Sequence, residues 1–263
     1  RKGANDHRVH HMSLRIEIIG VAGLPEVIEG DSLSTMIYDA VRDQGADLEN
    51  GDVVVVAQKI VSKSEGAVVD LKTVTPSEQA HELAETVKKD PRLVEVILQQ
   101  SAQIVRTAPG VLITETIHGL VCANSGVDSS NSAQDDQVII LPPDPDKSAR
   151  GLKSGLEKRS GVRIGIIVSD SFGRPWREGS TNIAVGIAGF EPLEDARGRG
   201  DDHGRVLRAT VVAVADELAA AAQLVMGEFG GVPTAIVRGA QITSSDSANA
   251  GLLQRSPKTD LFR

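Results

Sequence analysis

Four consecutive valines at positions 53–56 constrain the fold more than any other feature of this 263-residue sequence. β-Branched residues favour strands, and an unbroken apolar run is typical of a strand covered on both faces of its sheet. The segment VRIGIIVSD at 162–170 has the same apolar character. We therefore expect at least two strands in the interior of a sheet, and the chain is long enough to build the core that covers them.

The other segments mix helical spacing with short apolar runs, and their type follows from periodicity and turn residues. Helices are expected at 33–45, 75–90, 91–102, 142–161 and 209–226, and strands at 14–20, 162–170, 232–239 and the start of 52–63, while 181–190 is apolar and contains glycine. Four short segments at 103–107, 111–116, 119–123 and 137–141 are expected to form an antiparallel meander. The predicted fold class is α+β, with mixed or antiparallel sheets and packed helices, rather than a purely parallel doubly wound fold.

Composition excludes several classes of function. Aromatic residues make up only 2 % of the chain, so its core has to be built from Val, Ile, Leu and Ala. The net charge of −8 argues against general nucleic-acid binding, which usually needs a basic face. No apolar run approaches the ~20 residues of a membrane span. The single cysteine, Cys122, is interpreted as a core residue rather than a nucleophile. One cysteine cannot form an intramolecular disulfide, which fits a reducing compartment. We therefore predict a cytoplasmic protein, and the lack of a membrane-length apolar run predicts no membrane partner.

The two ends of the sequence differ from the part between them. Residues 1–11, RKGANDHRVHH, lack the apolar middle of a signal peptide and are interpreted as a disordered extension or an expression remnant. Residues 246–263 are polar and are expected to form a loose tail, which is also a candidate edge of a fused domain. Residues 12–245 then form the main domain.

The segment NSGVDSSN at 124–131 places one carboxylate, Asp128, among small residues between two expected strands. One interpretation is a surface turn, since Gly, Asn, Asp and Ser all favour turns. The other is a site for a hard cation or a phosphate, because small residues let backbone N–H groups approach an anion and a carboxylate can hold Mg²⁺ or Mn²⁺. Taken alone, the segment leaves both interpretations open.

A second polar segment, VSDSFGRPWREG at 168–179, begins where the apolar strand is expected to end, at Val168. Asp170 and Ser171 would then stand at the mouth of the strand and could hold a divalent cation. Arg174 and Arg177 follow, and arginines form bidentate bonds with phosphate oxygens. The alternative is a surface loop with a structural Asp–Arg pair.

Two further segments carry groups that suit a bound phosphate. QKIVSKSEG at 58–66 places Lys59 and Lys63 at the exit of a buried strand, although it lacks the spacing of a Walker A loop and could be a solvated basic turn. MGEFGGV at 226–232 surrounds Glu228 with glycines after an Ala-rich helix, and it could be an ordinary helix stop. Carboxylates, cations and Gly-rich backbone together are what a site for a metal and a nucleotide needs.

The order and spacing of these motifs resemble the family of coenzyme F420-0:L-glutamate ligases, which add glutamate to a deazaflavin cofactor. The resemblance runs from about Ile16 to Gly239. The matching segments are GLPEVIEGD (23–31), GDVVVVAQKIVSKSEG (51–66), NSGVDSSN (124–131), LPPDPDKSA (141–149), VSDSFGRPWREG (168–179), GRGDDHGR (198–205), VAVADELAAAAQLVMGE (212–228) and VPTAIVRG (232–239).

The resemblance implies a site residue by residue. Its guanine-nucleotide contacts would fall on Leu24, Pro25, Glu26, Val27, Gln58, Lys59, Lys63, Asn131, Met226, Gly227, Glu228, Phe229, Gly230, Gly231 and Val232. Its divalent metal ligands would fall on Asp128, Asp170, Ser171 and Glu228. Lys63, Arg174 and Arg177 would orient phosphates as catalytic residues. The family pattern has Ser-Thr at Gln58-Lys59, which leaves the choice between GTP and ATP open, and Thr at Ser171.

The resemblance also implies an architecture and a reaction. The fold would contain two interleaved subdomains in an intertwined homodimer. The substrates would be coenzyme F420-0 and L-glutamate, and the cofactors GTP and Mg²⁺ or Mn²⁺, with K⁺ as a further candidate. The bond would form through an acyl phosphate. Two alternatives remain at this stage: a nucleotide- or deazaflavin-binding module without ligase activity, and a ligase for another acid.

Overall fold

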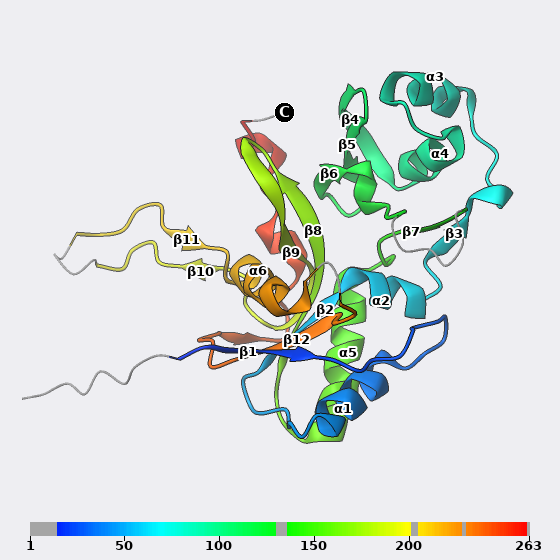
Figure 1. The fold of residues 1–263 in the computed structure, drawn as a ribbon. Helices are drawn as coiled ribbons and strands as arrows, with labels where there is room; N and C mark the ends of the chain where they lie inside the picture. The colour runs from blue at the N-terminus through cyan, green and yellow to red at the C-terminus, as the bar shows by residue number, and fades with distance from the viewer. Residues whose placement is uncertain (1–14, 130–135, 201–204, 228–229, 262–263) are drawn as a thin grey trace, which may run out of the picture.

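A six-stranded mixed sheet forms the centre of the protein, in a computed structural model that describes residues 15–129, 136–200, 205–227 and 230–261 (Figure 1). Its strand order is β1-β12-β2-β8-β9-β13. Strands β2 and β8 run parallel, and every other neighbouring pair is antiparallel. The strands are β1 (Glu17–Val21), β2 (Val53–Ala57), β8 (Gly165–Arg174), β9 (Arg177–Phe190), β12 (Thr234–Arg238) and β13 (Ser244–Ser245).

The valine run lies in the middle of this sheet and faces two separate cores, as the sequence predicted. Val54 and Val56 pack with α1 (Leu33–Asp43) and α5 (Pro145–Ser160) on one face. Val53 and Val55 pack with α6 (Val214–Met226) on the other face. All four valines are fully buried, so both faces of β2 are covered. The α+β class with mixed and antiparallel sheets is confirmed.

A smaller antiparallel sheet packs against two helices beside the central sheet (Figure 1). Its strands are β4 (Ser101–Ala108), β5 (Val111–Thr116) and β6 (Val121–Ala123), and its helices are α3 (Glu78–Val87) and α4 (Pro91–Gln99). The expected four-stranded meander is therefore correct for three strands and wrong for the fourth. The fourth strand, β7 (Gln137–Ile139), pairs instead with β3 (Val68–Asp70), a partner that is distant in sequence.

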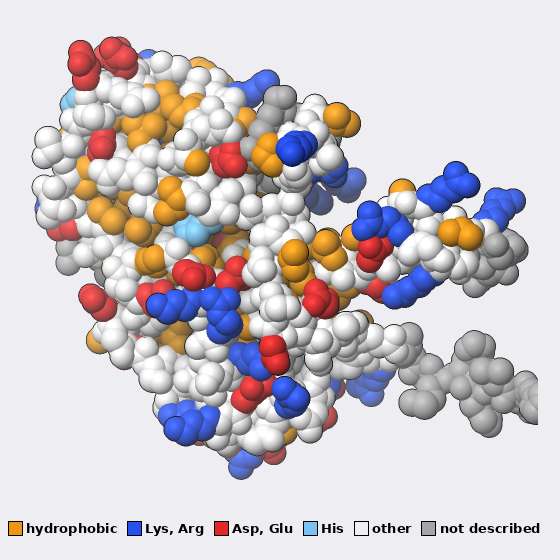
Figure 2. Space-filling view, turned by 180° about the vertical axis from the view of Figure 1, so that it is seen from behind, with side chains coloured by type: hydrophobic (Ala, Val, Ile, Leu, Met, Phe, Trp, Pro, Cys, Tyr) orange, Lys and Arg blue, Asp and Glu red, His pale blue; other side chains and the backbone are white. Residues whose placement is uncertain are grey.

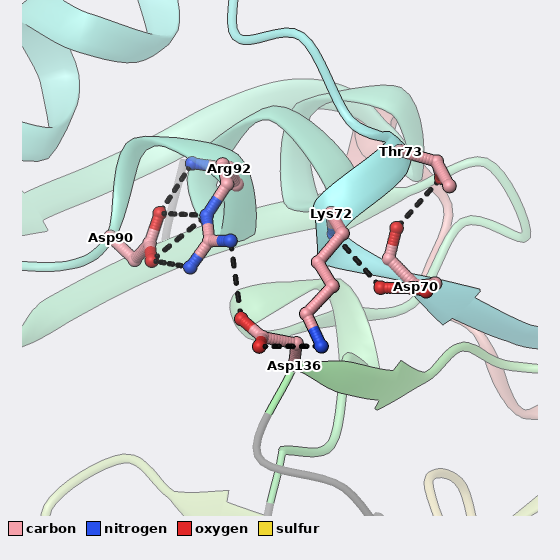
Figure 3. A network of polar contacts seen from close by, with 6 residues as sticks. All are labelled: Asp70, Lys72, Thr73, Asp90, Arg92 and Asp136. Atoms are coloured by element: carbon pink, nitrogen blue, oxygen red, sulfur yellow. Dashed lines mark hydrogen bonds and ion pairs between the residues drawn. The ribbon is translucent and has the colours of Figure 1, made fainter.

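A group of charged side chains holds the start of β7 against α4 and the 3-10 turn that follows β3 (Figure 3). The carboxylate of Asp136 lies 3.1 Å from the Arg92 guanidinium and 3.3 Å from the Lys72 ammonium. Arg92 also pairs with Asp90, the N-cap residue of α4. Asp136 therefore fixes one end of the segment that begins at NSGVDSSN, whereas residues 130–135, including Asn131, lie outside the described residues.

Strands β10 (Glu194–Asp195) and β11 (Val211–Val212) form the base of an arm that extends away from the central sheet (Figure 1). Basic side chains gather on this arm (Figure 2). Arg197 and Arg199 pair there with Asp195 and Glu194. The arm carries the GRGDDHGR motif, of which residues 201–204 are not described.

The C-terminal residues are less loose than the sequence suggested. Ala248 and Ala250 are buried, the Ala250 N–H donates to Asp146 on α5, and Gln254 donates to the backbone oxygen of His118. Polar composition hid this packing, because the contacts use small side chains and backbone groups. Over the described residues, none of the helices has the length and apolar character needed to span a membrane.

Candidate functional site

A cleft of about 780 Å³ collects most of the residues that the motifs singled out. Its walls come from the loop before α1, the start of α2 (Gln58–Ser64), the Asp128 segment, the middle of β8 and the end of α6. The predicted site residues that line it are Leu24, Pro25, Glu26, Val27, Gln58, Lys59, Lys63, Asp128, Asp170, Ser171, Met226, Gly227, Gly231 and Val232. Of the other predicted residues, Gly230 is described but is not part of the lining, and Asn131, Glu228 and Phe229 lie outside the described residues.

The two lysines stand on a helix, and the expected strand exit or basic turn is wrong. Residues 58–64 form α2 directly after β2, so Lys59 and Lys63 are one helical turn apart and share a face. Lys59 Nζ lies 2.7 Å from Asp128 Oδ2, and Lys63 Nζ lies 2.6 Å from Glu26 Oε1. The helix thus presents both ammonium groups to the cleft, each beside a carboxylate.

Gln58, the first residue of α2, fixes the position of this helix in the wall of the cleft. It is 2 % exposed, and its Nε2 donates to Ser62 Oγ at 2.6 Å and to the Ile140 carbonyl at 3.1 Å. Ser62 Oγ donates to the same carbonyl at 2.6 Å. Because the Gln58 amide is occupied in this way, its side chain ties α2 to the strand beside Asp128.

Asp128 lies on a segment that is a turn, but not a surface turn. Its N–H and C=O both pair with Ile139, each at 2.8 Å. Upstream, Asn124 and Ser125 have positive φ angles of 53°, a strained backbone for these residues. The buried Ser125 hydroxyl bonds to Ser101 and Thr114 at 2.6 Å each. The small residues let the backbone fold tightly, and the pairing with Ile139 fixes the backbone from which the Asp128 carboxylate projects.

Asp170 and Ser171 come from the interior of a strand rather than from its mouth. Strand β8 continues past Val168 to Arg174 and pairs with β9 throughout, so the prediction that it ends at Val168 is wrong. The Ser171 hydroxyl donates to Asn182 Oδ1 at 2.7 Å across the hairpin. An irregularity in the β8–β9 register falls between Val168 and Ser169, at the point where the strand turns from the apolar core to the cleft.

Arg174 and Arg177 lie at the tip of the β8–β9 hairpin and not in the cleft lining. Arg174 donates from Nη2 to the Glu178 carbonyl at 2.7 Å and from Nε to the Gly179 carbonyl at 3.3 Å. Its guanidinium therefore closes the turn. The expectation that these arginines face the same site as Asp170 is not met, because the strand carries them further along the hairpin.

Sequence reasoning missed several residues of the cleft. Asn182 and Gln223 both line it, and the Asn182 N–H donates to Gln223 Oε1 at 2.9 Å. Ser169 and Pro233 complete this wall. The register of the β8–β9 hairpin would have identified Asn182, which is the cross-strand partner of Ser171.

The nearby thiol has no role as a nucleophile. Burial raises the pKa of the Cys122 thiol to about 12, and the negative charge of Asp170 adds to the shift. Cys122 thus stays protonated at neutral pH, as expected for a core residue.

The oxygen donors of the cleft suit a hard divalent cation. Two carboxylates, Asp128 and Asp170, and the Ser171 hydroxyl line it together, and oxygen ligands are what Mg²⁺ and Mn²⁺ prefer. The Lys59 ammonium beside Asp128 shows that this carboxylate already accepts a cation. No cluster of three or more His, Cys, Asp or Glu side chains occurs in the described part of the chain, and the third expected carboxylate, Glu228, lies outside it.

Comparisons with known proteins agree on one family. The sequence model of the family described as "F420-0:Gamma-glutamyl ligase" matches residues 22–239. A protein of Methanothermobacter thermautotrophicus is 47 % identical over 225 residues, which cover 85 % of this chain and 89 % of that protein. Proteins of Methanocaldococcus jannaschii and Methanopyrus kandleri are each 45 % identical, over 95 % of this chain and 97 % and 98 % of theirs. All three carry the name coenzyme F420:L-glutamate ligase.

Proposed function

The chain belongs to the F420-0:gamma-glutamyl ligase family, and from this membership we propose that it is a GTP- and divalent-metal-dependent ligase that joins L-glutamate to coenzyme F420-0 in coenzyme F420 biosynthesis. One structural observation carries the proposal. Most of the family motifs, which are scattered over the sequence, meet in one cleft that presents Lys59 and Lys63 together with the carboxylates of Glu26, Asp128 and Asp170. Cations for phosphates and carboxylates for a metal are the groups that phosphoryl transfer from a nucleotide requires.

The chemistry follows from the low reactivity of a carboxylate as an acyl donor. A carboxylate oxygen of the cofactor attacks the γ-phosphorus of GTP, and the bond to the leaving GDP breaks to give an acyl phosphate. The amine of L-glutamate then attacks the acyl carbon, loses a proton and expels inorganic phosphate. Neither step needs a protein nucleophile, which fits a cleft whose neighbouring Cys122 stays protonated.

The residues of the cleft would have different roles in this reaction. Asp128, Asp170 and the Ser171 hydroxyl would hold Mg²⁺ or Mn²⁺, which supplies positive charge against the β- and γ-phosphates when bound. Lys63 and Lys59 line the same cleft and would orient the phosphates. The Leu24–Val27 loop and the end of α6 would contact the nucleotide. Arg174 and Arg177 have no contact assigned in this scheme, because they lie at the hairpin tip.

The test of the function is incubation of the purified chain with coenzyme F420-0, GTP, Mn²⁺ and L-glutamate, followed by mass spectrometry. We expect a product heavier by one glutamyl residue for each addition, together with stoichiometric GDP. ATP in place of GTP tests the nucleotide preference, which Lys59 and the buried Gln58 leave open. Binding of nucleotide without any product would instead support a binding module.

Lys63→Ala is expected to raise the Michaelis constant for GTP about ten- to hundred-fold, with little change in that for glutamate. The reason is the loss of a charge-assisted hydrogen bond to phosphate, which contributes about 1.5–3 kcal/mol. Steady-state kinetics with each substrate varied in turn measures the effect. Lys158→Ala, on α5 outside the cleft, is the matched control. Unchanged GTP saturation in a folded Lys63→Ala protein would contradict the assignment.

We also propose an intertwined homodimer, following the family. The small sheet supports this, because Val111 and Val121 lie on its outer face and are each about 40 % exposed, as expected of a face that another copy covers. Light scattering should give a mass near twice that of one chain. A monomer that stays fully active at all concentrations would refute the dimer without touching the ligase assignment.

A further inference from the structure

The ion pair between Lys59 and Asp128 joins a cation of α2 to the carboxylate that is proposed as a metal ligand. Lys59 Nζ lies 2.7 Å from Asp128 Oδ2, and the two side chains are 25 % and 27 % exposed. The two residues of this pair differ in their freedom to move. The Asp128 backbone is held by its two hydrogen bonds to Ile139, whereas the Lys59 ammonium sits on a flexible four-carbon stem that can swing.

A divalent cation and the Lys59 ammonium compete for the same oxygen. A divalent cation lies about 2.0–2.6 Å from its oxygen ligand, so an ion bound to this oxygen would take the place where the ammonium now donates. Two cations at such a short separation repel each other strongly. Binding of metal to Asp128 Oδ2 therefore requires Lys59 to leave this oxygen. The space open to the displaced side chain is the cleft itself, whose wall Lys59 forms together with Lys63.

We propose that Lys59 is an exchangeable counter-ion: it occupies Asp128 before metal binds, and it moves to a nucleotide phosphate when the metal takes its place. This inference rests on the proposed function for the presence of metal and nucleotide in the cleft. It makes Lys59 an opponent of metal binding and a supporter of nucleotide binding. Because coupling between two ligands is reciprocal, each ligand then favours the other through this one side chain.

Lys63 provides the comparison within the same helix. It stands one turn further along α2 and has the same charge, but it pairs with Glu26, whose side chain is 76 % exposed on the loop before α1. Metal binding at Asp128 leaves this second pair intact. The two lysines should therefore differ in their effect on metal affinity, although both add positive charge to the cleft.

The test measures Mn²⁺ binding to the full chain without nucleotide, from the electron paramagnetic resonance signal of free Mn²⁺. Lys59→Met is expected to bind Mn²⁺ about tenfold more tightly than wild type, equivalent to about 1.4 kcal/mol. Lys63→Met should stay within about twofold, and Lys59→Arg, which keeps the charge, should stay near wild type. Equal gains in both Met variants would assign the effect to the general charge of the cleft, and no gain in Lys59→Met would overturn the exchange.

The second measurement uses a fluorescent guanine nucleotide with saturating Mn²⁺. Here Lys59→Met should bind the nucleotide about tenfold more weakly, opposite in sign to its effect on Mn²⁺. Unchanged nucleotide affinity would overturn the transfer of Lys59 to phosphate. A loss of both affinities would indicate a structural role instead, and thermal unfolding of each variant checks that possibility.

Asp128→Asn separates this inference from the proposed function. If Asp128→Asn binds Mn²⁺ as wild type does, the metal site itself is wrong. If Asp128→Asn weakens Mn²⁺ binding while Lys59→Met leaves it unchanged, only the exchange fails. In the Asp128→Asn background, Lys59→Met should give no further gain, because the competition for this carboxylate no longer exists.

Discussion

Asp128→Asn and Asp170→Asn are each expected to lower the rate of glutamate addition by about a thousand-fold or more while the protein stays folded. An amide keeps the shape of the side chain but loses the negative charge that holds a hard cation. A metal ion contributes several kcal/mol of charge stabilisation to a phosphoryl-transfer transition state, and about 4 kcal/mol corresponds to a thousand-fold in rate. Both carboxylates line the cleft, so we expect the two Asn variants to keep the fold.

Product formation by mass spectrometry and Mn²⁺ affinity measure the two consequences separately. Asp246→Asn is the matched control, because its side chain is 84 % exposed and lies away from the cleft. The control should keep full activity and full Mn²⁺ affinity. Wild-type turnover in a folded Asp128→Asn protein would show that Asp128 has no part in the reaction, and the metal assignment would have to move to other residues.

Four strands of the central sheet, β1, β2, β8 and β12, could be predicted because local composition identifies them. Four adjacent valines place apolar side chains on both faces of the strand, so β2 had to be buried on both faces. The longer helices could be predicted for the same reason, since their ends carry local signals: Ser77 caps α3, and Asp90 with Pro91 begins α4. These features depend on residues within one or two turns of each other.

The errors arise where groups outside a segment decide its structure, or where a segment carries no local signal of its own. Strand β8 continues through Asp170, Ser171 and Arg174, residues that suggest a loop, because β9 supplies hydrogen bonds along its whole length. Strand β7 leaves the meander because β3 pairs with it. The short helix α2 follows a strand without a break, and no sequence pattern separates seven helical residues from the end of that strand.

The site could be predicted only as a set of residues, not as a set of contacts. The motifs identified Lys59, Lys63, Asp128 and Asp170, which the structure brings together. The resemblance assigned Gln58 to the nucleotide. In the structure, the Gln58 amide nitrogen donates to Ser62, 4 residues away, and to Ile140, 82 residues away. Long-range hydrogen bonds of this kind leave no trace in local composition.

Arg238→Met is expected to destabilise the protein by about 3 kcal/mol, because it leaves a buried carboxylate without its partner. Arg238 ends β12 and Asp52 precedes β2, 186 residues apart in sequence. Nε and Nη2 of Arg238 donate to the two oxygens of Asp52 at 2.9 and 2.8 Å, and the Asp52 side chain is only 1 % exposed. Breaking a buried pair from one side costs about 3–5 kcal/mol, and the 22 % exposure of Arg238 favours the lower end.

The expected fall in midpoint temperature is about 10 °C, at about 2–4 °C for each kcal/mol, measured by calorimetry or circular dichroism. Arg199→Met is the control: it breaks a pair with Glu194 whose side chains are 62 % and 51 % exposed, so it should cost no more than about 1 kcal/mol. Equal losses in the two variants would show that burial of Asp52 does not matter.

A second substitution, Asp52→Asn, distinguishes two causes of the destabilisation in Arg238→Met. One is the lost attraction of the ion pair, and the other is the uncompensated charge that remains on Asp52. If the cost of Arg238→Met comes from the charge that remains on Asp52, adding Asp52→Asn should restore part of the stability, because the neutral amide needs no partner of opposite sign. The Glu49 N–H, which donates to Asp52 Oδ2 at 2.8 Å, can still donate to the Asn oxygen. If the double variant is instead less stable than Arg238→Met, the hydrogen bonds of the Asp52 carboxylate outweigh the penalty for burying its charge.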